Sequence, residues 1–96
     1  MFEVRQTESY ERWFSSLRDR ATKVRVDVRI RRLSLGIPGD VRPVGEGVSE
    51  LRVNFGPGYR IYFIQKDRNV IVLLAGGDKS SQGRDIVEAK TLARSL

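Results

Sequence analysis

The residues best suited to chemistry lie in the segment SELRVNFGPGYRIYFI, residues 49–64, which places Arg52 and Arg60 on either side of GPG. Alternating apolar residues around a glycine-rich turn predict a β-hairpin with a three-residue loop. With that loop, Asn54 lies opposite Arg60 and Arg52 lies opposite Tyr62 on one face. The apolar residues of the other face are Leu51, Val53, Phe55, Tyr59, Ile61 and Phe63.

Neighbouring guanidinium groups repel each other mildly unless an anion lies between them. The polar face of the hairpin therefore predicts a preformed anion site on a rigid sheet. The alternative is a solvated sheet face, since antiparallel sheets commonly have one and arginine is common there.

A second residue that could bind an anion, Lys79, follows the apolar run 70–77, in the segment AGGDKSSQGRD. The pattern predicts a strand-to-helix junction, so Lys79 emerges beside the sheet and near a helix N-terminus, which favours anions. The spacing is not that of a P-loop. The alternative is an ordinary surface lysine in a capping turn.

Composition narrows the possible chemistry. The chain has no cysteine and no histidine, which excludes disulfides and thiolates and removes the commonest metal ligand and general base. No close acidic cluster replaces them, so we expect neither metal nor cofactor. The formal net charge is +6, and 14 of 18 basic residues are arginine. Arginine matches phosphate and carboxylate geometry, so the expected partners are nucleic acid or acidic protein.

Length and hydropathy predict one soluble domain spanning residues 1–96. The N-terminal segment, MFEVRQTESYERWF, lacks the apolar core of a signal peptide. The longest apolar run, VIVLLA, is far shorter than the roughly 20 residues that span a bilayer. We therefore expect a cytoplasmic protein with no membrane contact.

The chain must supply elements that position these residues. Residues 2–5 read as a strand, and Thr7 reads as the N-cap of a first helix. A short edge strand is expected within residues 37–50. The remaining expected elements are strands at 50–55, 59–65 and 70–77, and a final helix capped by Ser80 or Ser81.

Residues 19–35 allow two interpretations, because the alternation of VRVDVRIR is typical of a strand. We predict a helix, since the span is long and Gly36 with Pro38 would end it. Such a helix has one apolar stripe for the sheet. The second stripe contains Ala21, Val24, Val28 and Leu35; it requires the first helix or a partner protein as cover.

Two segments together, GDVRPVGEGVSELRVNFGPGYRIYF and LLAGGDKSSQ, resemble the RelE/ParE superfamily of bacterial toxins. The resemblance is closest to the HigB-like addiction module killer proteins. It implies an α+β fold in which a small twisted antiparallel sheet carries two N-terminal helices and one C-terminal helix. The expected element order agrees with this fold, and the resemblance favours the helix at 19–35.

The resemblance implies a toxin of a type II toxin–antitoxin system that cleaves mRNA on the ribosome and inhibits translation. Arg52, Arg60 and Lys79 stand where RelE-like enzymes carry basic catalytic residues. The family often has a tyrosine or histidine near the last helix; this chain has neither there, and Tyr62 is the possible substitute. The implied partners are the ribosome, mRNA and a cognate helix-turn-helix antitoxin, for which the second stripe of the 19–35 helix is a docking candidate. The alternative is that this side of the 19–35 helix binds no partner and is a solvated basic surface packed only against the first helix.

Metal-free RNA cleavage uses the 2′-hydroxyl of the substrate as nucleophile and leaves a 2′,3′-cyclic phosphate and a 5′-hydroxyl. Arginine is a poor base but stabilises charge on phosphoryl oxygens. Lys79 and Glu50 are the conceivable bases, and we expect Asn54, Glu50 and Arg84 to bind substrate. Two other functions share the fold: ParE-type poisoning of DNA gyrase without RNase activity, and a basic binding module without catalysis.

Overall fold

The computed structural model describes residues 1–96 and has the predicted order of elements, β α α β β β β α. The elements are β1 (Glu3–Gln6), α1 (Glu8–Ser16), α2 (Arg20–Ser34), β2 (Val41–Gly45), β3 (Val48–Val53), β4 (Tyr59–Gln65), β5 (Val70–Asp78) and α3 (Gln82–Arg94). A single 3-10 turn, Lys79–Ser81, joins β5 to α3. The predicted α+β class is confirmed.

The strands form one sheet in the order β1-β5-β4-β3-β2. Strands β2 to β5 pair antiparallel, as predicted, whereas β1 pairs parallel to β5. The sheet is therefore mixed rather than wholly antiparallel. The departure is at an edge strand, where the long segment between β1 and β5 gives the chain room to return in the same direction.

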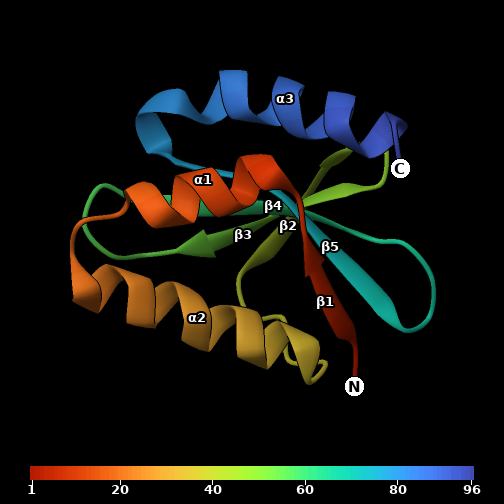
Figure 1. Ribbon diagram of the computed structural model, residues 1–96, viewed down its shortest axis with the longest axis horizontal. Helices are drawn as coiled ribbons and strands as arrows, with labels where there is room; N and C mark the ends of the chain where they lie inside the picture. The colour runs from red at the N-terminus through yellow and green to blue at the C-terminus, as the bar shows by residue number, and fades with distance from the viewer.

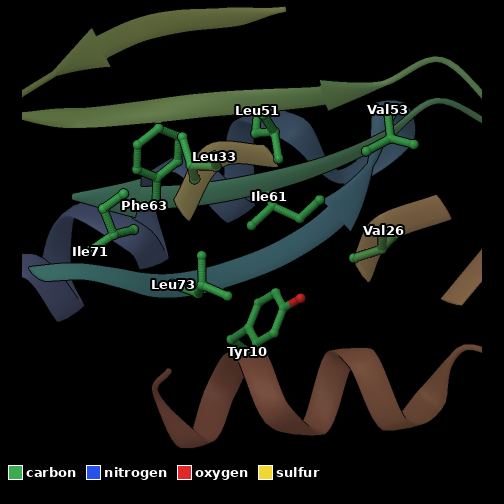
Figure 2. Packing of buried hydrophobic residues seen from close by; sticks show 9 residues of the cluster. All are labelled: Tyr10, Val26, Leu33, Leu51, Val53, Ile61, Phe63, Ile71 and Leu73. Atoms are coloured by element: carbon green, nitrogen blue, oxygen red, sulfur yellow. The ribbon is translucent and has the colours of Figure 1, made fainter. Parts of the chain in front are cut away.

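Helices cover both faces of the sheet, with α2 and α3 on opposite sides (Figure 1). Figure 2 shows the main apolar cluster, in which α1 and α2 pack on the sheet: Tyr10, Val26, Leu33, Leu51, Val53, Ile61, Phe63, Ile71 and Leu73. A second cluster lies on the α3 face: Val48, Tyr62, Val70, Val72, Leu74, Ala75 and Ala89. Both faces of the central strands are thus buried.

The ambiguous segment at 19–35 is helical, as predicted. Asp19 caps α2, its carboxylate accepting a hydrogen bond from the backbone N–H of Ala21 at 3.1 Å. Val26 and Leu33 are buried, whereas Val24 and Val28 remain 53% and 43% exposed. Neither α1 nor the sheet therefore covers the second apolar stripe.

The β3–β4 hairpin has a longer loop than the sequence predicted. Strand β3 ends at Val53 and β4 begins at Tyr59, so residues 54–58 form the loop. The backbone N–H of Gly58 donates to the carbonyl of Phe55 at 3.2 Å, and Gly58 has a φ of +80°, which favours glycine. The loop closes on itself, so Phe55 does not pair with Tyr59.

This loop corrects the predicted register by two residues. Arg52 lies directly opposite Arg60, and Glu50 lies opposite Tyr62. The pairing of Asn54 with Arg60 and of Arg52 with Tyr62 was wrong. A two-residue shift leaves each side chain on its predicted face. Arg52, Arg60 and Tyr62 therefore still share one face, with different partners, whereas Asn54 lies in the loop and has no cross-strand partner.

None of the three helices combines the length and the apolar character needed to cross a bilayer.

Candidate active site

Arg60 and Lys79 line one shallow hollow of about 360 Å³ at the end of the sheet. The remaining lining residues are those of the hairpin loop: Asn54, Phe55, Gly56, Pro57 and Gly58. Arg60 lies on β4 opposite Gly77 of β5, and Lys79 follows the last residue of β5. The antiparallel pairing of β4 with β5 therefore brings the two cations to the same end of the sheet.

Gly58 of the hairpin loop lies next to both Arg60 and Lys79. A Cβ atom at Gly58 would lie 3.7 Å from Cβ of Lys79 and 3.8 Å from Nη1 of Arg60. Because glycine has no side chain, the loop leaves space open beside both residues. The predicted convergence of Arg60 and Lys79 is therefore present in the structure.

A buried carboxylate lies behind the hollow. Glu50 is 1% exposed, and its Oε2 atom accepts hydrogen bonds from the Tyr62 hydroxyl at 3.0 Å and from Nε2 of Gln82 at 2.8 Å. The Nε atoms of Arg52 and Arg60 lie 3.4 Å and 3.7 Å from its two oxygens. The protein itself therefore supplies an anion beside the paired arginines.

The two arginines differ in their exposure. The Arg60 side chain is 8% exposed and the Arg52 side chain is 24% exposed. The Nε atoms of both are buried and make no hydrogen bond, so their interaction with Glu50 is purely electrostatic. Arg52 does not line the hollow. Of the predicted cationic trio, Arg60 and Lys79 line the hollow, whereas Arg52 lies outside it, opposite Arg60 on the neighbouring strand β3.

Tyr62 occupies the interior rather than the surface. It is 0% exposed. Burial, followed by the hydrogen bond to Glu50, raises the pKa of its phenol above the ordinary value. The hydroxyl thus remains protonated and already donates to Glu50. We predicted Tyr62 as a catalytic group, but in this arrangement its phenol cannot contact a substrate in the hollow.

The three residues predicted to bind substrate lie in different parts of the structure. Asn54 is exposed and lines the hollow, whereas Glu50 is buried and offers no surface to a ligand. Arg84 is exposed on the first turn of α3 and does not line the hollow. Hydrogen bonds from Ser80, and to a lesser degree the charge of Arg84, lower the pKa of Asp78.

The start of α3 brings two further residues to this face that the sequence reasoning did not assign. Gln82 binds Glu50, and Asp85 is 8% exposed and accepts a hydrogen bond from the Ser81 hydroxyl. A Cβ atom at Gly77 would lie 1.8 Å from Oδ2 of Asp85, so only glycine permits this close approach. The signal available in the sequence was Glu50 itself, a carboxylate at the start of a predicted strand, which requires partners when it is buried.

Ser81 occupies the N-cap position of α3, one of the two predicted positions. Its side chain makes no capping hydrogen bond to the helix backbone and instead donates to Asp85. The structure contains no group of three or more carboxylate residues placed to hold a metal ion.

The sequence is similar to known proteins along nearly its whole length. Residues 12–95 match the family of phage-derived Gp49-like proteins, DUF891. A protein of Haemophilus influenzae of uncharacterised function is 39% identical over 94 residues, which cover 98% of this chain and 95% of that protein. The chain therefore belongs to the Gp49-like family of phage-derived proteins, a RelE-like family of toxins from toxin–antitoxin systems.

Proposed function

We propose that this protein is a HigB-like toxin that cleaves ribosome-bound mRNA and so inhibits translation. The observation that supports this most strongly is the convergence of Arg60 and Lys79 on one open hollow. Two cations held at the end of a sheet suit a phosphodiester group, because both can contact its non-bridging oxygens. Family membership supports the toxin assignment, and the hollow supports the nuclease chemistry.

In the proposed reaction, the 2′-oxygen of the substrate attacks the adjacent phosphorus while the bond from phosphorus to the 5′-oxygen breaks. The products are a 2′,3′-cyclic phosphate and a 5′-hydroxyl. Arg60 and Lys79 stabilise the additional negative charge that develops on the phosphoryl oxygens. The ribosome holds the mRNA in the reactive geometry, so positioning contributes much of the rate.

Lys79 is also the candidate proton carrier. Arg60 and Lys79 are the only ionisable residues that line the hollow, and arginine does not lose its charge at neutral pH. The Lys79 ammonium can donate a proton to the leaving 5′-oxygen, and water accepts the proton of the 2′-hydroxyl. This assignment replaces Tyr62, which is buried.

The test is to express the protein in bacteria and to map the 5′ ends of all messages. We expect cuts within translated regions that leave 5′-hydroxyl ends. Arg60→Ala should abolish most of these cuts, whereas Arg68→Ala, in the exposed turn between β4 and β5, should cut normally. Full toxicity of Arg60→Ala would contradict the proposed site. DNA breaks without RNA cuts would instead indicate gyrase poisoning.

We further propose that the cognate antitoxin docks on the uncovered side of α2. A groove of about 370 Å³ lies between this helix and the end of β3. Its lining residues are Val24, Arg25, Val28, Arg29, Arg32, Val53 and Asn54. Exposed valines flanked by arginines fit an amphipathic segment with acidic residues at its edges.

The docking proposal has a simple genetic test. Val28→Glu places a carboxylate among the valines and should keep the toxin active, because Val28 lies outside the hollow. We expect this variant to remain toxic when the antitoxin is co-expressed, whereas the wild-type protein is neutralised. Neutralisation of both proteins would exclude this groove as the antitoxin site.

A further inference from the structure

Glu50 is buried at a cost that its contacts must offset. A carboxylate with 1% exposure loses nearly all of its hydration, which destabilises the folded state unless partners replace the water. Those partners are Tyr62 and Arg60 on β4, Arg52 on β3 and Gln82 on α3. The carboxylate is therefore tied to two strands and one helix.

Arg60 is the partner that the chemistry of the hollow requires. Its Nε atom lies 3.7 Å from Glu50, and its Nη1 atom reaches the space beside Gly58, at the hollow. One side of the guanidinium group therefore faces a fixed negative charge, and its far end faces the proposed substrate. Without Glu50, Arg60 would face the like charge of Arg52 directly across the strand pair.

We propose that Glu50 is a positioning residue for the RNA cleavage: its carboxylate, fixed by Tyr62 and Gln82, holds Arg60 with its terminal nitrogens directed into the hollow. The inference rests on the proposed nuclease function and adds to it a residue that never contacts RNA. It also assigns Gln82 a role, since this side chain links the start of α3 to the carboxylate.

The main test uses Glu50→Gln, which keeps the volume of the side chain and removes its charge. Because the amide NH₂ group cannot attract a guanidinium donor, Arg60 should lose its fixed orientation. We expect kcat on ribosome-bound mRNA to fall about 10- to 100-fold, with KM changed by less than about 3-fold. Glu50→Asp keeps the negative charge but shortens the side chain by one methylene, so the carboxylate lies further from Arg60. This variant should retain more activity than Glu50→Gln.

Glu46→Gln is the matched control. Glu46 lies in the exposed turn between β2 and β3 and pairs with Arg94 at 2.9 Å. The control removes the same charge far from the hollow, so kcat should stay at the wild-type value. A merely structural role of Glu50 predicts a lower melting temperature with unchanged kcat per folded molecule, and that result would overturn the proposal.

A second measurement follows the Arg60 side chain directly. In ¹⁵N-labelled protein, the Arg60 Nε–H should exchange slowly with water in the wild type and rapidly in Glu50→Gln. Equal exchange in both proteins would overturn the orientation argument. If Glu50→Gln does not fold, Gln82→Ala replaces it, with an expected kcat loss of about 3-fold; wild-type kcat in that variant would count against the proposal.

The exchange measurement separates this inference from the proposed function. If the wild-type protein cuts no RNA, the nuclease proposal fails, and with it any role of Glu50 in cleavage. Slow exchange of the Arg60 Nε–H that depends on Glu50 would still establish that the carboxylate orients the arginine.

Discussion

The two faces of the β3–β4 hairpin are buried to the same depth but are built from different chemistry. Leu51 and Ile61, which face α1 and α2, are both 0% exposed, while Glu50 and Arg60, which face α3, are 1% and 7% exposed. Apolar burial stabilises the fold wherever side chains fit together. Burial of charge stabilises only when the set of partners is complete. The first face of the hairpin stabilises the fold through apolar packing alone, and the chemistry proposed above depends on the complete set of charged partners on the second.

The largest effect should come from the apolar face. Leu51→Ala removes most of a fully buried side chain at the centre of the main cluster, and we expect the free energy of unfolding to fall by about 2–5 kcal/mol. The measurement is urea denaturation at 25 °C. RNA cleavage per folded molecule should not change. A loss of cleavage in folded protein would show that the two faces are not separable.

Adjacent glycines of β5 provide a matched test of both faces. A Cβ atom at Gly76 would lie 2.2 Å from the ring of Trp13, and one at Gly77 would lie 1.8 Å from Asp85. Gly76→Ala and Gly77→Ala should each reduce the free energy of unfolding by about 1–3 kcal/mol through overpacking. Only Gly77→Ala should also reduce cleavage, because it displaces the start of α3. Equal cleavage by the two variants would contradict the distinction between the faces.

Alkaline titration compares one tyrosine on each face. Burial is the main cause that raises the pKa of both Tyr10, on the apolar face, and Tyr62, on the polar face. An unfolded phenol loses its proton near pH 10, whereas the folded one retains it. The unfolded state then binds fewer protons, so the free energy of unfolding should fall as pH rises above about 10, by up to about 1.4 kcal/mol per pH unit for each tyrosine.

Urea denaturation at pH values between about 9 and about 11, a range that brackets the ordinary tyrosine pKa of about 10, measures how steeply the free energy of unfolding falls with pH. Tyr10→Phe and Tyr62→Phe should each remove one tyrosine's share of it. Only Tyr62→Phe should also reduce cleavage, because it leaves Glu50 without one donor. A slope unchanged by either substitution would exclude tyrosine ionisation as its cause.

The smallest expected effect concerns the cap of α2. Asp19→Ala removes the hydrogen bond to the N–H of Ala21 and should reduce the free energy of unfolding by about 1 kcal/mol. Because α2 packs on the apolar face, cleavage should remain at the wild-type level. A change in kcat would connect this helix to the site.

Local signals were sufficient for the elements and for the assignment of residues to faces. The length of the span and the stop signal of Gly36 and Pro38 predicted α2 against its strand-like alternation. The period of two in β3 and β4 separated Leu51 and Ile61 from Arg52 and Arg60, and that separation survived an error in register.

The backbone geometry of the hairpin loop and the non-local packing of α3 determined what could not be predicted. The loop closes through Phe55 and Gly58, and its length of five residues depends on glycine backbone angles that the GPG pattern alone does not specify. The burial of Glu50 and Tyr62 arises because α3 covers this face. No local pattern around residue 50 reports the position of a helix that begins at Gln82.

The most direct measurement is a double-mutant cycle on Arg60 and Lys79, with single-turnover cleavage of mRNA on purified ribosomes. If both cations act on one phosphate, Arg60→Ala and Lys79→Ala should each slow cleavage by about 100-fold or more. The double variant should then be less impaired than the product of the two losses, with a coupling of about 0.5–3 kcal/mol. Wild-type rates in either single variant, or losses that multiply without coupling, would contradict a shared phosphate site.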